Sequence, residues 1–214
     1  MNKRKKIYIA LALSPFGSVF LLIALILLTT QSSNGNASGN PVNSLVDFIA
    51  PFSDDVTYTI SSSFGNRMDP FTNQPSFHSG IDLCATDGTP IVASANGVVW
   101  ETAYDRLLGR YVKIEHDVNG QKYCTTYGHM IEDSVVVSKD EPVERGQKIG
   151  IIGSSGQVTG RHVHFMITSS ECKYGKANLF NPQEIIDADL VRRKQMKNDN
   201  NATEDGTNND DYVD

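Results

Sequence analysis

The sequence predicts an all-β domain built on an antiparallel sheet or sandwich, and three observations support this fold class. Short runs rich in β-branched and aromatic residues follow one another between residues 55 and 190. Gly, Asn and Asp separate these runs at close intervals, and no long amphipathic helical pattern interrupts them. The runs read TYTISSSF, PIVASANGVVWETAY, RYVKIEHDV, QKYCTTYGH, IGIIG and RHVHFMI. Frequent short strands with turn signals between them are typical of antiparallel sheets.

Residues 1–30 predict a transmembrane anchor or a signal segment. Residues 3–6 are all basic and precede an uncharged stretch from Ile7 to Thr30. At about 1.5 Å per residue this stretch can cross a bilayer core of roughly 30 Å, whereas secretory signals carry apolar runs of about 7 to 15 residues. Positive charge before an apolar run places the N-terminus in the cytoplasm. We therefore expect a single-pass helix in the cell membrane with the rest of the chain extracellular, and secretion after cleavage near Ala37 as the alternative.

The segments on either side of the domain have a different composition. Residues 31–54 predict a flexible linker, since their first part is rich in Ser, Asn and Gly. The folded domain is expected over residues 55–190. Near its end, Asn181-Pro182-Gln183-Glu184 predicts a short helix to about Lys194, because Asn caps helices and Pro favours the first helical position. Residues 191–214 are expected to hold the end of this helix and a disordered acidic tail.

The charge balance excludes one class of partner. The chain has 19 Lys and Arg against 25 Asp and Glu. Without the four basic residues at positions 3–6, 15 basic residues remain against 25 acidic ones, a net charge of −10. Nucleic-acid binding needs clustered positive charge, so we expect no nucleic-acid partner.

The chain has three cysteines, Cys84, Cys124 and Cys172, in the segment expected outside the cell, where disulfides form. Because three is an odd number, at least one thiol is unpaired or pairs between chains. Their spacing matches no zinc-finger pattern. We expect isolated buried thiols, with a bridge from Cys84 to Cys124 as the alternative.

Asn119-Gly120 is the clearest turn, because this pair is preferred in two-residue hairpins. The resulting register pairs Val118 with Gln121, His116 with Tyr123 and Val112 with Tyr127. Tyr123 lies six residues from His129, roughly 20 Å along the strand. His116 therefore cannot share a site with His129, and we expect a structural role for it.

The run RHVHFMI places two imidazoles on one face of a strand. Side chains alternate along a strand, so His162 and His164 share a face while the apolar residues between and after them share the other. Upstream, His78 and Asp82 are separated by three residues, and Ser79-Gly80 allows the bend that would bring them together. Imidazole and carboxylate ligands suit zinc, and catalytic zinc sites take three protein ligands.

Several motifs in one order resemble a known family. FHSGIDL, GTPIVASANGVV, TTYGHM, ERGQKIGIIGSSG and GRHVHFMI, preceded by SSSFGNRMDPFT, resemble the zinc metallopeptidases of the lysostaphin and LytM type, which cut peptide bonds in bacterial peptidoglycan. The resemblance covers roughly Ser61 to Ile167. It implies the antiparallel β fold of that family, the duplicated hybrid motif.

The resemblance also implies a role for each site residue. His78, Asp82 and His164 would bind Zn2+, while His129 and His162 would be catalytic residues beside a zinc-activated water. Zinc lowers the pKa of a bound water and polarises a carbonyl, so the two imidazoles would move protons and stabilise the oxyanion. The assignment of general base between His129 and His162 stays open.

These inferences predict a membrane-anchored zinc endopeptidase acting on stem peptides or cross-bridges of peptidoglycan. The alternative is a non-enzymatic membrane-anchored module that has an envelope or sporulation protein as its partner. The filled ligand positions favour the enzyme. The predicted membrane anchor and the lack of a recognisable wall-targeting repeat keep the module as the alternative.

Overall fold

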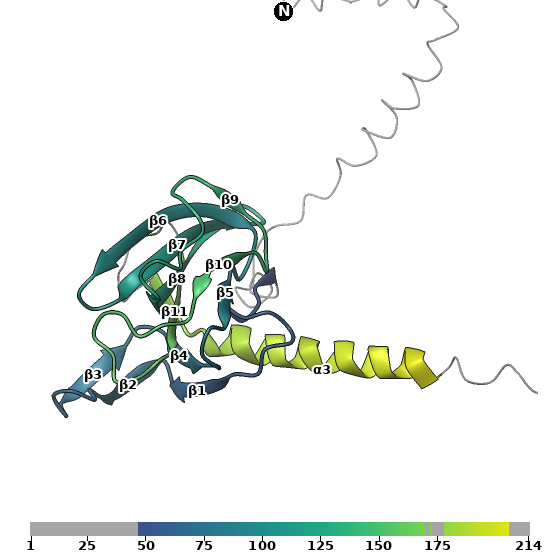
Figure 1. Ribbon diagram of the computed structural model, residues 1–214, viewed down its shortest axis with the longest axis horizontal. Coiled ribbons are helices and arrows are strands. Elements are labelled where there is room, and N and C mark those ends of the chain that lie inside the picture. The colour runs from purple at the N-terminus through teal and green to yellow at the C-terminus, as the bar shows by residue number, and fades with distance from the viewer. Residues whose placement is uncertain (1–46, 170–171, 173–177, 206–214) are drawn as a thin grey trace, which may run out of the picture. The chain divides into compact units, whose positions relative to one another are not determined.

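The computed structural model describes residues 47–169, 172 and 178–205 (Figure 1). Its elements are β1 (Thr59–Ser62), β2 (Gly65–Met68), β3 (Pro75–His78), β4 (Ile81–Cys84), β5 (Pro90–Val92), β6 (Gly97–Asp105), β7 (Gly109–Val118), β8 (Gln121–Met130), β9 (Pro142–Val143), β10 (Lys148–Ile151), β11 (Val163–Ser169), β12 (Leu179–Phe180) and α3 (Gln183–Asp205). The predicted all-β class with a C-terminal helix is confirmed. The predicted membrane segment, most of the predicted linker and the end of the tail lie outside the described residues.

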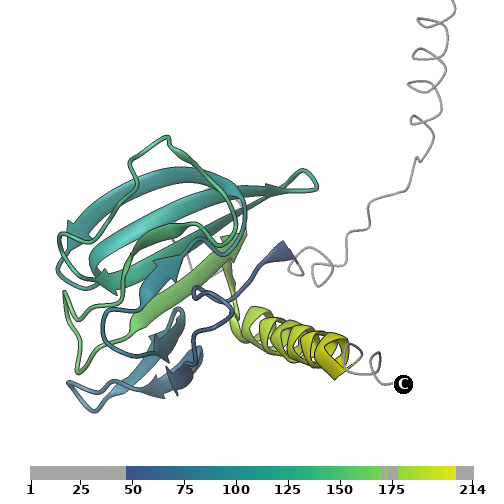
Figure 2. The ribbon, with the colours of Figure 1, turned by 45° about the vertical axis from the view of Figure 1, so that its right-hand side comes forward.

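One large antiparallel sheet determines which segments are neighbours. Its strand order is β1-β4-β11-β8-β7-β6-β9, with β12 pairing β11, and two further sheets are formed by β10-β5 and β2-β3. The strands of the large sheet curve, and α3 lies to one side of them (Figure 2). The order places β4 and β8 on either side of β11. Segments distant in the sequence, each carrying a predicted site residue, are therefore adjacent.

The hairpin between β7 and β8 has the predicted register. Val118 pairs with Gln121, His116 with Tyr123 and Val112 with Tyr127. Asn119 and Gly120 both have positive φ, 55° and 81°, as a type I′ turn requires. His116 is fully buried, with Nδ1 2.8 Å from the Asn96 carbonyl oxygen and Nε2 2.7 Å from Thr125 Oγ1. Its predicted structural role away from His129 agrees with these contacts.

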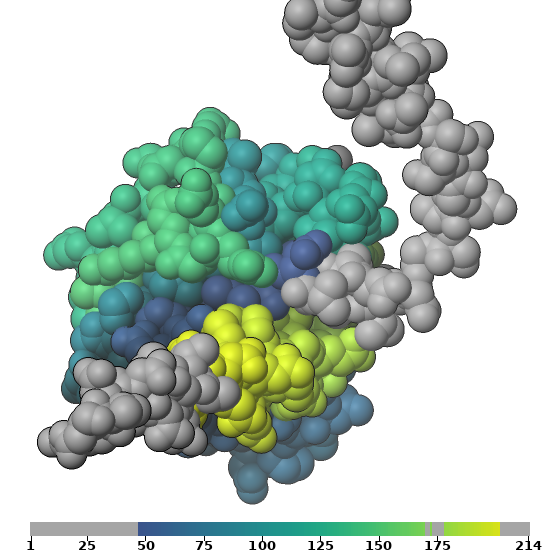
Figure 3. Space-filling view, turned by 90° about the vertical axis from the view of Figure 1, so that its right-hand side faces the viewer, coloured from purple at the N-terminus to yellow at the C-terminus, as the bar shows by residue number. Residues whose placement is uncertain are grey.

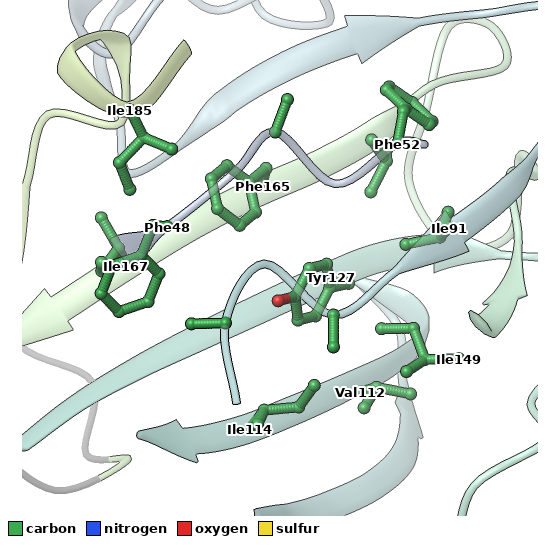
Figure 4. Close-up of a cluster of buried hydrophobic side chains, with 14 of the residues drawn as sticks. Phe48, Phe52, Ile91, Val112, Ile114, Tyr127, Ile149, Phe165, Ile167 and Ile185 are labelled. Atoms are coloured by element: carbon green, nitrogen blue, oxygen red, sulfur yellow. The ribbon is translucent and has the colours of Figure 1, made fainter. Parts of the chain in front are cut away.

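The core lies on the face of the sheet that the strand alternation predicts. Val163, Phe165 and Ile167 of β11 are fully buried. Figure 4 shows Phe165 and Ile167 among other apolar side chains of the core. His164 and Met166 face the opposite side, where they line a groove. Burial of the alternate apolar residues therefore fixes the orientation of His164.

The folded domain begins earlier than expected. Phe48, Ala50 and Phe52 fall in the predicted linker of residues 31–54, but they are almost completely buried in the core. The backbone N–H of Ile49 donates to the Ser94 carbonyl at 2.8 Å. The linker prediction followed from the polar residues before position 47, but burial of the aromatic side chains of Phe48 and Phe52 stabilises an ordered segment here. The linker prediction is therefore wrong from residue 47 onward.

Helix α3 begins as predicted but ends later. Asn181 Oδ1 accepts a hydrogen bond from the backbone N–H of Gln183 at 3.1 Å, which is the expected cap. The helix continues to Asp205, beyond the expected end near Lys194 and into part of the predicted disordered tail. No helix among the described residues is long and apolar enough to cross a membrane.

The buried side of α3 holds the N-terminal segment of the domain. Arg193 donates to the carbonyl oxygens of Phe52, Ser53 and Val56 at 2.7 to 3.0 Å. Its charge is paired with Asp189, whose Oδ2 lies 2.6 Å from Arg193 Nε. The helix packs against the early segment (Figure 3). The same arginine thus satisfies three backbone carbonyls and joins residues 52–56 to α3.

The cysteine predictions are wrong for two of the three residues. Cys124 and Cys172 form a disulfide, and Cys84 is free. Cys124 in β8 lies opposite Thr168 in β11, and the chain reaches Cys172 shortly after that strand ends. Cys84 lies in β4, which β11 separates from β8. The strand order therefore decides the pairing, and it excludes the bridge from Cys84 to Cys124.

Candidate metal centre

Adjacent strands bring three predicted ligands together. Asp82 in β4 and His164 in β11 are cross-strand partners, although they lie 82 positions apart in the sequence. His78 is the last residue of β3, and Ser79-Gly80 leads from it into β4. The pairing of β4 with β11 and the turn before β4 together build the cluster.

Glycine is required at position 80 because the turn leaves no space for a side chain. A Cβ atom added to Gly80 would lie 2.5 Å from the Phe165 carbonyl oxygen and 2.8 Å from Cε1 and Nε2 of His164. Gly80 is not among the residues with positive φ. Glycine was expected here for its conformational freedom, but the structure shows a different reason, the close approach of the turn to β11.

The three ligand atoms converge on one point. His78 Nε2 lies 3.1 Å from both Asp82 Oδ1 and His164 Nδ1, and the latter two atoms are 2.9 Å apart. All three side chains are buried. One carboxylate oxygen and two imidazole nitrogens thus lie together, with no apolar group between them. This donor set suits a divalent cation such as zinc.

The electrostatics of the cluster favour a cation. Burial raises the pKa of the Asp82 carboxyl, but its hydrogen bonds with His164 and His78 outweigh burial and hold that pKa well below its usual range. Burial also lowers the pKa of His164, which favours the neutral imidazole. Asp82 Oδ2 lies 3.6 Å from Arg67 Nη1, so the two carboxylate oxygens contact different groups. An anionic carboxylate with neutral imidazoles is the protonation state that binds a metal.

A backbone carbonyl orients His78. Its Nδ1 lies 2.8 Å from the Ser63 carbonyl oxygen, which can only accept a hydrogen bond, so Nδ1 carries the proton. Nε2 then presents its lone pair to Asp82 and His164. Metal-binding histidines commonly have this second hydrogen bond, which fixes the ring and the tautomer.

His129 and His162 lie beside the cluster. Their ring centroids are 4.7 Å apart, and His162 Nε2 lies 3.6 Å from Asp82 Oδ1. Nδ1 of His129 donates to the Ser155 carbonyl at 2.9 Å, and Nδ1 of His162 donates to the Gly160 carbonyl at the same distance. Burial lowers the pKa of His129 to about 4, so this ring is neutral at physiological pH. Both rings therefore keep Nε2 available as a proton acceptor.

A groove of about 720 Å³ runs over the cluster and gives it access to solvent. All five predicted site residues line it. Its walls are apolar in part, from Met68, Phe71, Leu107, Leu108 and Val158. A partly apolar groove of this volume is typical of ligand-binding sites in proteins.

The structure thus brings the five predicted residues into one groove and leaves His116 apart. The roles assigned to the five residues remain predictions. Sequence reasoning missed Ser155 and Ser63, whose contribution to the site is made by their backbone carbonyls. Any residue type provides a carbonyl, so the sequence carries no signal for such a partner.

The chain belongs to a known family. Residues 76–178 match peptidase family M23. The solved structure of LytU is 33% identical to the chain, with a TM-score of 0.54, and the match covers 64% of this chain and 91% of that one. The catalytic domain of lysostaphin from Staphylococcus simulans shares the fold, with a TM-score of 0.51 at 23% identity over 59% of this chain and 90% of that one. The chain is therefore a member of peptidase family M23, and the resemblance found in the sequence is confirmed.

Two curated relatives share the matched region. The chain is 39% identical over 112 residues to peptidoglycan DD-endopeptidase ShyA of Vibrio cholerae, covering 52% of this chain and 25% of that protein. It is 40% identical over 111 residues to DD-carboxypeptidase/endopeptidase Mpg of Neisseria meningitidis, covering 51% of this chain and 24% of that protein. The chain thus spans about a quarter of the length of these relatives.

Proposed function

We propose that the chain is a zinc-dependent endopeptidase that hydrolyses peptide bonds in bacterial peptidoglycan, within stem peptides or cross-bridges. The observation that carries this proposal is the convergence of His78 Nε2, Asp82 Oδ1 and His164 Nδ1 within one groove. The two further imidazoles in the groove support a catalytic rather than a purely structural metal site. The names of ShyA and Mpg support peptidoglycan as the substrate.

Each site residue has a defined task in this proposal. The ion would be held by His78, Asp82 and His164. When bound, it would lower the pKa of a water molecule and polarise the scissile carbonyl. One of His129 and His162 accepts at Nε2 the proton that the attacking water loses. The other donates a hydrogen bond to the oxygen on which negative charge develops. The apolar walls of the groove contact the peptide substrate.

The proposal places the domain outside the cell. The basic residues 3–6 and the uncharged stretch from Ile7 to Thr30 support a membrane anchor with the domain on the extracellular side. Secretion after cleavage is the alternative, and both locations give access to peptidoglycan. The disulfide between Cys124 and Cys172 supports an oxidising compartment.

Digestion of purified peptidoglycan tests the proposal. The zinc-loaded full chain should release muropeptides whose masses differ from the substrate by hydrolysis of an amide, and a chelator should abolish the release. The His162→Ala variant serves as the matched inactive control. Unchanged fragment masses with a zinc-loaded, folded protein would favour the non-enzymatic envelope module instead.

A further inference from the structure

His129 lies where β8 departs from regular pairing with β7. Arg110 pairs with Met130 and Val112 with Tyr127, so β8 has two residues, Gly128 and His129, opposite the single residue between Arg110 and Val112. His129 has a φ of 61°, in the left-handed region that non-glycine residues seldom adopt. This is a β-bulge, a device that turns a side chain away from the regular strand direction. The bulge aims His129 at the groove.

Ser155 bridges the two strands at this bulge. Its Oγ accepts a hydrogen bond from the backbone N–H of Arg110 at 2.9 Å and donates one to the Met130 carbonyl at 2.6 Å. Arg110 and Met130 are opposite each other in the register. The hydroxyl thus joins an N–H and a carbonyl on facing residues, with one atom acting as acceptor and donor.

The same residue also holds the imidazole. The carbonyl oxygen of Ser155 accepts the Nδ1 proton of His129 at 2.9 Å. Because the carbonyl has no proton to give, it selects the tautomer with a free Nε2. The backbone N–H of His129 donates to the Leu108 carbonyl at 2.7 Å, which fixes the other end of the residue.

The segment around Ser155 has no room to shift toward β7. A Cβ atom on Gly109 would lie 2.4 Å from both the carbonyl oxygen and Oγ of Ser155. A Cβ atom on Gly156 would lie 2.3 Å from the Gly109 backbone nitrogen. The two glycines therefore permit the backbone at Ser155 and Gly156 to lie close to Gly109. Within this contact, the hydrogen bonds of the Ser155 hydroxyl fix the position of the Ser155 carbonyl.

We propose that Ser155 is a positioning residue for His129: its hydroxyl bridges β7 and β8 so that its carbonyl fixes the ring orientation and tautomer of the imidazole. This inference rests on the proposed function for its effect on turnover, but the tautomer itself is independent of hydrolysis. Ser155 does not act as a nucleophile, since its hydroxyl hydrogen bonds are to backbone groups.

Substitution of the hydroxyl tests the inference. Ser155→Ala keeps the backbone carbonyl but loses both hydroxyl bonds, so kcat should fall about 10- to 100-fold while KM and zinc content stay near the wild-type values. The pH profile of kcat should change as well, because the variant no longer holds the His129 ring in one tautomer. Ser155→Thr keeps a hydroxyl and should restore most of the lost activity. The neighbouring exposed Ser154, changed to Ala, is the matched control and should behave like the wild type.

Imidazole NMR of the full chain provides a readout that needs no turnover. In 15N-histidine-labelled protein, His129 should give one tautomer with the proton on Nδ1, and Ser155→Ala should show a mixture of tautomers. A single unchanged tautomer in Ser155→Ala, or an equal loss of activity in Ser155→Thr with a wild-type melting temperature, would overturn the inference. Absence of hydrolysis in the wild type together with the expected tautomer shift would contradict the proposed function alone.

Discussion

Gly80 and His164 approach so closely that only a hydrogen fits between the Gly80 Cα and the imidazole. A Cβ atom on Gly80 would lie 2.8 Å from two ring atoms of His164 and 2.5 Å from the Phe165 carbonyl oxygen. Because the carbonyl belongs to the backbone of β11, it cannot move without disturbing the pairing with β4. The close contact at Gly80, in the turn before β4, thus restricts the position of the predicted zinc ligand His164.

Gly80→Ala should therefore damage the metal site and the fold together. We expect a loss of about 1 to 3 kcal/mol in the free energy of unfolding, as for other overpacked positions, and weaker zinc binding. Denaturant unfolding and a zinc titration measure the two effects. Gly160→Ala is the matched control, because no atom lies within 4 Å of its added Cβ. Equal stability and zinc affinity in both variants would contradict the packing argument.

The ligand assignment predicts different results for two histidine variants. The wild-type chain should bind about one zinc ion. His78→Ala should lose it, because a buried ligand atom is removed from the cluster. His162→Ala should keep the zinc and lose hydrolysis. Elemental analysis of the purified variants gives the metal content, and full zinc occupancy in His78→Ala or zinc loss in His162→Ala would refute the division of roles.

The disulfide should contribute substantially to stability. It joins residues 48 positions apart, and closing a loop of that length in the unfolded chain corresponds to about 4 kcal/mol. Cys172→Ser should lower the free energy of unfolding by an amount of that order, as should reduction of the wild type. Cys84→Ser serves as the control, since Cys84 is the free thiol. If reductant left the denaturation midpoint of the wild type unchanged, the prediction would fail.

His116 should make the protein less stable in mild acid. Burial lowers its pKa from 6.5 to about 4, so the unfolded chain binds a proton at His116 more readily than the folded one between these values. The stability associated with the neutral His116 is fully present above pH 6.5 and is lost as the pH falls toward 4. Over this range the free energy of unfolding should decrease by roughly 3 kcal/mol in total. Unfolding of the wild type and His116→Gln across this range measures it. The variant should show the smaller decrease in stability with falling pH, and parallel curves would contradict the prediction.

Local patterns in the sequence predicted much of the fold. Asn119-Gly120 predicted the hairpin and its register because the turn requires positive φ at two successive residues. Alternation in RHVHFMI predicted the buried and groove-facing sides of β11 because side chains alternate along any strand. The cap at Asn181 marked the start of α3 for an equally local reason.

The limits of the domain were less predictable. Phe48 and Phe52 follow a polar stretch, and only the core they join reveals that they are ordered. The end of α3 and the pairing of Cys124 with Cys172 were also mispredicted. For the aromatic side chains and the disulfide, the deciding contact joins residues far apart in the chain, and local composition does not encode such contacts.

The sequence by itself determined which residues are available for chemistry: three candidate ligands in His78, Asp82 and His164, two further imidazoles, and the strand face on which His164 lies. Only the tertiary structure decided how they meet. The pairing of β4 with β11 places Asp82 against His164, and the bulge in β8 turns His129 into the same groove. The carbonyls of Ser63, Ser155 and Gly160 then choose the tautomers of three imidazoles. The physical reason is that side-chain identity is local, whereas strand order and backbone carbonyl positions depend on the packing of the whole domain.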